Sequence, residues 1–87
     1  MIAPGLAVVT GASAGIGREF CVQLAARGHD LVVVARDGER LAALQRELTQ
    51  RHRIAVEPFP ADLAREPDIA RVAERVGRAA ELSVLVN

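Results

Sequence analysis

Residues 6–17 are the part of this chain whose residue types and spacing are best suited to chemistry. They read L-A-V-V-T-G-A-S-A-G-I-G, an apolar run followed by Gly11, Gly15 and Gly17. Glycine adopts backbone conformations closed to other residues and leaves no Cβ between a turn and a diphosphate. A helix that begins here presents unpaired N–H groups and a partial positive charge. The spacing predicts a phosphate-binding turn, in which Ser13 donates to a phosphate oxygen, caps the helix, or does both.

A second position of interest lies at the end of the predicted strand Asp30–Ala35, directly after its apolar run at residues 31–34. At this strand end of a dinucleotide site, an acidic residue binds the ribose 2′-hydroxyl of NAD, whereas an arginine accommodates the 2′-phosphate of NADP. Ala35 stands where the acidic residue of an NAD site would be, and Arg36 follows it. Asp37 is the nearest acid, but it lies beyond that position and is suited to capping a helix. A guanidinium holds phosphate through two parallel hydrogen bonds. The pattern favours NADP, and Arg40 is either a second contact or, by preference, a solvated surface residue.

Other polar residues give weaker signals. Asp62 and Leu63 follow the third apolar segment, where an Asp can accept from an adenine amino group while Leu63 packs on the ring. A turn or helix-capping role for Asp62 is an equal alternative. Cys21 is expected to be a small buried hydrophobe, and His29 and His52 to be solvated or capping residues. No catalytic residue and no metal site is predicted.

Alternating apolar runs and amphipathic segments must position these residues. Continuous apolar runs are typical of parallel strands covered on both faces, and a 3.6-residue period is typical of helices. The pattern predicts strands at about 5–10, 30–35, 54–59 and 82–86, and helices at about 15–27, 37–50 and 66–80. With right-handed crossovers, the fold class is α/β: a Rossmann-like three-layer αβα arrangement with strand order 3-2-1-4, half of a doubly wound parallel sheet.

Several details of these elements are also predicted. Gly28 is expected to end the first helix, while Pro58 and Pro60 place the third strand at a sheet edge or end it early. Each helix is expected to bury one apolar stripe. The expected stripes are Ile16, Phe20 and Leu24; Leu41, Leu44 and Leu48; and Ile69, Val72 and Val76.

Composition bounds the class of protein. The 87 residues suffice for one short domain, and 51% are hydrophobic, which is enough for a core. The formal net charge is zero, which argues against a nucleic-acid or membrane-surface partner. A single cysteine, which cannot form an internal disulfide, indicates a reducing compartment. The lack of a long apolar run predicts neither a leader peptide nor a membrane-spanning segment. The expected location is the cytoplasm.

Together these signals resemble the short-chain dehydrogenase/reductase (SDR) family over the whole chain. They are T-G-A-S-A-G-I-G at residues 10–17, Arg36, Asp62-Leu63 and L-V-N at residues 85–87. The resemblance is to NADP-dependent reductases of carbonyl compounds, and it implies that residues 1–87 are the N-terminal half of a Rossmann-fold dinucleotide-binding domain. The cofactor-binding residues that it implies are Gly11, Ser13, Ala14, Gly15, Ile16, Gly17, Arg36, Asp62, Leu63 and Asn87.

The chemistry of that family lies outside these residues. It needs a Tyr-x-x-x-Lys pair with a Ser and an Asn, and this sequence has no Tyr and no Lys. Ser13 and Ser83 lie in the glycine turn and at the start of the fourth strand, so neither replaces the catalytic Ser. The resemblance implies a parent enzyme, an expected homo-oligomer, that moves hydride between NADPH and a small carbonyl or alcohol substrate. The alternative is a non-catalytic dinucleotide-binding module or a truncated remnant.

Overall fold

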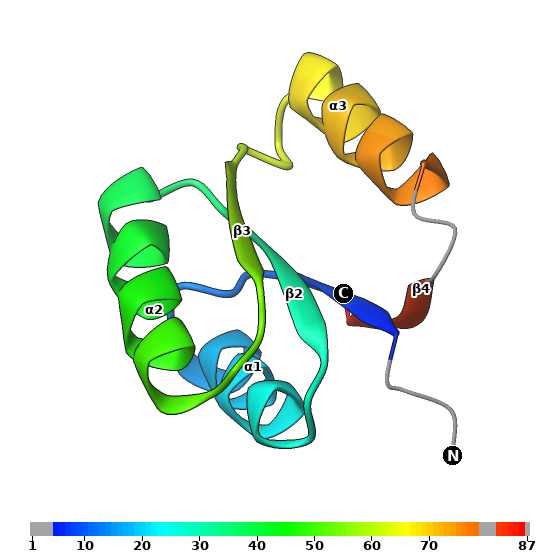
Figure 1. The fold of residues 1–87 in the computed structure, drawn as a ribbon. Helices are drawn as coiled ribbons and strands as arrows, with labels where there is room; N and C mark the ends of the chain where they lie inside the picture. Colours follow the sequence, from blue (N-terminus) through cyan, green and yellow to red (C-terminus); the bar gives the residue numbers. More distant parts are fainter. Residues whose placement is uncertain (1–4, 79–81, 87) are drawn as a thin grey trace.

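Strands and helices alternate along the chain in a computed structural model that describes residues 5–78 and 82–86 (Figure 1). The elements are β1 (Leu6–Thr10), α1 (Gly15–Ala26), β2 (Asp30–Ala35), α2 (Gly38–Arg51), β3 (Val56–Pro60), α3 (Glu66–Gly77) and β4 (Leu82–Val86). The strands form one parallel sheet in the order β3-β2-β1-β4. The predicted fold class and strand order are confirmed.

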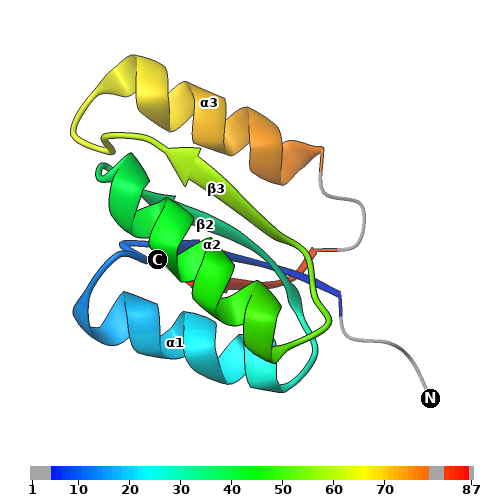
Figure 2. The ribbon, with the colours of Figure 1, turned by 60° about the vertical axis from the view of Figure 1, so that its left-hand side comes forward.

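Helices cover both faces of this sheet. Figure 2 shows α1 and α2 on one side and α3 on the other. Side chains of a strand alternate between faces, so Ala7 and Val9 of β1 pack with α1 and α2. Leu6 and Val8 pack on the face that α3 covers. Because β1 and β2 are covered on both faces, their sequences are continuous apolar runs.

The second helix follows its sequence pattern closely. Leu41, Leu44 and Leu48 are buried, as predicted, against the sheet face shared with α1. Asp37 is the N-cap, and its Oδ1 accepts from the backbone N–H of Arg40 at 3.1 Å. The capping role expected of Asp37 is therefore confirmed, and it fixes where α2 starts beside the end of β2.

The predicted face of α1 is partly wrong. Ile16 is 78% exposed and Phe20 is 45% exposed. Gly17 lies against the backbone of Gly11, and this close approach sets the rotation of the helix. The residues four, seven and eight positions after Gly17 consequently face the sheet. These buried residues are Cys21, Leu24 and Ala25.

The third helix buries less than its pattern predicts. Val72 and Val76 are half-buried against the sheet, but Ile69 is 46% exposed and no described residue of α3 is fully buried. On the same face, Leu85 of β4 is 56% exposed. The apolar stripe of α3 is thus wider than the contact it makes with the described residues.

Element ends agree with the predictions to within three residues. β3 starts at Val56, two residues later than expected, and lies at the sheet edge as its two prolines indicated. α3 ends at Gly77, three residues earlier than expected. Gly28 has a φ of +90° just after α1, which confirms the predicted helix stop. Among the described residues, no helix combines the length and apolar character needed to cross a membrane.

Candidate functional site

The three glycines of the glycine turn (residues 11–17) have different structural roles. Gly11 and Gly15 have φ angles of +65° and +58°, in the left-handed region that other residues rarely adopt. Gly17 has an ordinary φ, but a Cβ there would overlap the Gly11 carbonyl group and approach the Ala12 nitrogen to 3.3 Å. The turn therefore needs glycine twice for conformation and once for close packing.

Backbone hydrogen bonds join the loops at the carboxyl end of the sheet. The N–H of Ala12, in the glycine turn, donates to the Val34 carbonyl at 3.1 Å. The N–H of Ala61, just after β3, donates to the Ala35 carbonyl at 2.9 Å. The glycine turn and the loop after β3 are thus both attached to the end of β2. In open parallel sheets this edge, outside the carboxyl ends of the strands, is where ligands bind.

A cavity of about 650 Å³ opens at this edge. Five of the predicted cofactor-binding residues line it, and they come from the glycine turn, the end of β2 and the loop after β3: Gly11, Ser13, Arg36, Asp62 and Leu63. Four others lie along the turn and the start of α1 without lining the cavity: Ala14, Gly15, Ile16 and Gly17. Asn87 lies outside the described residues.

The cavity contains polar groups of both signs. Arg36 is exposed, and the described residues give it no hydrogen bond or ion pair. Ser13 does not cap α1, because the N-cap residue is Ala14, so this alternative is wrong. Arg40 and Asp37 also line the cavity and form an ion pair at 3.4 Å between Nε and Oδ2. Their i,i+3 spacing was the sequence signal for this ion pair.

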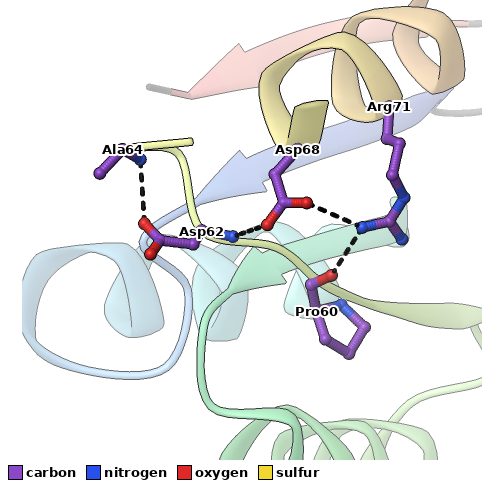
Figure 3. Close-up of polar contacts among 5 residues, drawn as sticks. All are labelled: Pro60, Asp62, Ala64, Asp68 and Arg71. Atoms are coloured by element: carbon purple, nitrogen blue, oxygen red, sulfur yellow. Dashed lines mark hydrogen bonds and ion pairs between the residues drawn. The ribbon is translucent and has the colours of Figure 1, made fainter. Parts of the chain in front are cut away.

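The β3–α3 loop (residues 61–65) is shaped by Asp62 (Figure 3). Its Oδ1 accepts from the Ala64 N–H at 2.9 Å, and its carbonyl oxygen accepts from the Arg65 N–H at 3.0 Å. Its own N–H donates to Oδ2 of Asp68 at 2.7 Å. The turn role for Asp62 is therefore confirmed, while Oδ2 of Asp62 has no partner among the described residues.

Asp68 connects this loop to the first turn of α3. The hydrogen bond from the Asp62 N–H, with smaller contributions from Arg71 and Arg65, lowers the pKa of the Asp68 carboxyl below its usual range. Asp68 therefore stays charged at neutral pH. Sequence reasoning did not find this residue, because an acid in the first turn of a helix is ordinarily explained by the helix dipole.

The remaining polar candidates are accounted for by structure. Cys21 is fully buried, as expected, and burial raises the pKa of its thiol to about 11, so it is not a thiolate at neutral pH. Nδ1 of His29 lies 2.9 Å from the Gly5 carbonyl oxygen. His52 is the C-cap of α2. Within the described residues, no cluster of His, Cys, Asp and Glu could hold a metal ion.

Comparison with known proteins identifies the family. The family model described as short chain dehydrogenase matches residues 5–87. The chain belongs to the short-chain dehydrogenase family. A very-long-chain 3-oxoacyl-CoA reductase of Aspergillus terreus is 38% identical over 84 residues, 93% of this chain and 24% of that protein. The corresponding reductase of Aspergillus clavatus is 44% identical over 62 residues, 71% of this chain and 18% of that protein.

Solved short-chain dehydrogenase structures share this fold. The enzyme from Sphingobium yanoikuyae, in complex with NADPH, superposes with a TM-score of 0.91 and 44% identity, over 93% of this chain and 32% of that one. L-sorbose reductase from Gluconobacter frateurii, with NADPH and L-sorbose, gives a TM-score of 0.87 and 32% identity, over 99% and 33%. The present chain thus spans about a third of these structures and a quarter or less of the curated relatives.

Proposed function

We propose that residues 1–87 are the N-terminal half of a Rossmann-fold domain that binds NADP(H), in a short-chain oxidoreductase. The parent enzyme would transfer hydride between the nicotinamide and a small carbonyl or alcohol substrate. The observation that carries the proposal is Arg36, an exposed guanidinium at the rim of a cavity bounded by the glycine turn. The Sphingobium and Gluconobacter relatives, which contain NADPH, support the choice of cofactor.

The glycine turn fits a diphosphate. The close packing of Gly17 beneath Gly11 brings the start of α1 against the turn, where helical N–H groups and the positive end of the dipole favour an anion. The hydroxyl of Ser13, which the described residues leave without a partner, lies at the same cavity. The remaining residues that would hold the cofactor along this turn are Ala14, Gly15 and Ile16. Asn87, which lies outside the described residues, is expected to contact the cofactor as well.

The choice of NADP over NAD follows from the charges at the end of β2. Selection of NAD requires a carboxylate that accepts from the ribose 2′-hydroxyl. The carboxylate available there, Asp37, accepts from the Arg40 N–H and pairs with the Arg40 guanidinium. Asp37 is thus occupied and partly neutralised, while Arg36 is free among the described residues to bind a 2′-phosphate bidentately. Asp62 Oδ2 is available to an adenine amino group, with Leu63, 37% exposed, beside the ring.

When bound, NADPH supplies the hydride, and the residues described here bind and orient its adenosine and diphosphate portion. Without Tyr and Lys in these residues, proton transfer to the carbonyl falls to other parts of the parent enzyme. We propose that this enzyme is a cytoplasmic homo-oligomer without a nucleic-acid or membrane partner. The zero net charge of residues 1–87 argues against a nucleic-acid or membrane-surface contact at this part of the enzyme. The second candidate is a dinucleotide-binding module without turnover, and hydride transfer by the full chain would exclude it.

The test is Arg36→Ala in the full chain as its gene encodes it. Loss of a charge-assisted phosphate contact is expected to weaken NADPH binding by roughly 30- to 100-fold, and NADH binding by less than about threefold. Titration calorimetry with both cofactors measures this. Arg46→Ala, on an exposed face of α2 away from the cavity, is the matched control and should change neither affinity. A wild-type protein that binds NADH as tightly as NADPH would contradict the proposal.

A further inference from the structure

The support for the β3–α3 loop comes from one carboxylate on α3. Figure 3 shows Asp68 extending from the first turn of the helix to the loop, where its Oδ2 accepts from the Asp62 N–H at 2.7 Å. Together with the Ala64 and Arg65 contacts described above, this bond fixes Asp62 through its N–H, its carbonyl and its side chain. The loop has no regular secondary structure to define it, so these bonds set its conformation.

The other oxygen of Asp68 is also engaged. Nη1 of Arg71 lies 3.4 Å from Oδ1 of Asp68 and 3.5 Å from the Pro60 carbonyl, as Figure 3 shows. The guanidinium lies over the Phe59 ring, 4.9 Å from its centroid. Arg71 therefore orients Asp68 against the end of β3, and Asp68 in turn holds the loop. A loop whose supporting carboxylate is held on both oxygens loses little further entropy when a ligand arrives.

Helix stabilisation alone does not account for this geometry. Both Glu66 and Asp68 lie in the first turn of α3, where either acid would interact favourably with the helix dipole. The N-cap residue is Arg65, which makes no side-chain capping bond. The first N–H groups of the helix have other partners, since those of Asp68 and Ile69 donate to the Arg65 carbonyl. The Asp68 carboxylate bonds to the loop instead, whereas Glu66 has no side-chain hydrogen bond to the described residues.

We propose that Asp68 is a positioning residue for the adenosine end of the dinucleotide site. It holds the Asp62 backbone so that Ala61, Asp62, Leu63 and Ala64 form the wall of the cavity opposite the glycine turn. Asp68 itself does not line the main cavity and acts through the loop. This inference rests on the proposed function, because it assigns a role within the same nucleotide site.

The experiment compares Asp68→Ala, Asp68→Asn and Glu66→Ala in the full chain. Calorimetry measures binding of NADPH, of adenosine 2′,5′-bisphosphate and of reduced nicotinamide mononucleotide. Asp68→Ala is expected to weaken NADPH and the bisphosphate by roughly five- to twentyfold and to leave the mononucleotide unchanged. Asp68→Asn keeps an acceptor for the Asp62 N–H and should stay within about threefold of wild type. Glu66→Ala removes an equivalent first-turn charge and should bind all three ligands normally.

A fourth variant covers the case in which Asp68→Ala does not fold. Arg71→Met removes the group that orients Asp68 and should weaken the bisphosphate by about two- to threefold. Equal affinities for Asp68→Ala and Glu66→Ala, or an equal loss for the nicotinamide mononucleotide, would overturn the role of Asp68. If the wild-type protein binds neither NADPH nor the bisphosphate, the proposed function fails instead, so the two failures are distinguishable.

Discussion

The two walls of the cavity are built in different ways. The glycine turn is shaped by what its backbone excludes: positive φ angles at Gly11 and Gly15, and no room for a Cβ at Gly17. The β3–α3 loop is shaped by side-chain hydrogen bonds, in which Asp62 and Asp68 accept from backbone N–H groups. One wall therefore depends on the absence of side chains, and the other on their presence.

This difference predicts how each wall responds to substitution. A steric requirement between backbone atoms cannot be met by a neighbouring group, so its violation should be severe. A hydrogen-bonded loop shares its support among several bonds, each contributing about 1 kcal/mol net, so its losses should be graded. Three glycine substitutions and the pH response of the loop test this contrast, in order of decreasing expected effect.

Gly17→Ala should cause the greatest damage. The new Cβ would overlap the Gly11 carbonyl, which belongs to a backbone that is itself bonded to β2 through Ala12. Neither side can move without breaking this packing, so we expect a loss of about 2–3 kcal/mol in unfolding free energy and no measurable cofactor binding. Urea denaturation and calorimetric titration of the full chain measure the two effects.

Gly77→Ala is the matched control for that substitution. It lies at the end of α3, has no positive φ, and an added Cβ would meet nothing within 4 Å. Because Ala favours helix over Gly, this variant should be neutral or more stable by up to ~1 kcal/mol. Equal destabilisation of the two variants would show that Gly17 is not a close-packing position.

Gly15→Ala should have an intermediate effect. A Cβ at this position has open space, but φ of +58° is strained for an L-residue. Strain of this kind costs about 1–2 kcal/mol, without a clash that would displace α1. We expect unfolding free energy to fall by that amount while the protein still binds NADPH measurably, as urea denaturation and titration would show. A loss as large as that of Gly17→Ala would mean that conformation matters as much as packing in this turn.

Much of this architecture could be predicted because it depends on local patterns. Apolar runs identified β1 and β2, and the period of Leu41, Leu44 and Leu48 identified the buried face of α2. The face of α1 could not be obtained in this way, because its rotation is set by a backbone contact at Gly17 between residues six positions apart. Periodicity favoured the larger Ile16 and Phe20, which the tertiary contact leaves exposed.

The site shows the same limit. Glycine spacing and strand ends indicated Gly11, Arg36 and Asp62, since these signals lie within short segments, and the structure brings all three to one cavity. Asp68 was missed because its role depends on the conformation of the loop, which brings the Asp62 N–H to the Asp68 carboxylate. No rule of sequence spacing specifies that conformation. Whether these residues bind a dinucleotide stays a prediction that the titrations above would test.

The smallest expected effect is the response of the loop to pH. Asp68 faces Arg71 on its own helix, Arg65 at the N-cap, and Asp62 in the loop, and the net result is a lowered pKa, chiefly through the Asp62 N–H. A group whose pKa is depressed by folding stabilises the folded state above its unfolded pKa, and that contribution is lost as pH falls through the folded pKa. The difference in unfolding free energy between wild type and Asp68→Ala should therefore be constant from about pH 8 to 5, and shrink only below about pH 4.

Urea denaturation of both proteins across this pH range measures the difference, with Glu66→Ala as the control. A difference that instead grows as pH falls from 7 to 5 would mean that folding raises the Asp68 pKa, and that the loop is held by the shape of its turn rather than by a charged acceptor.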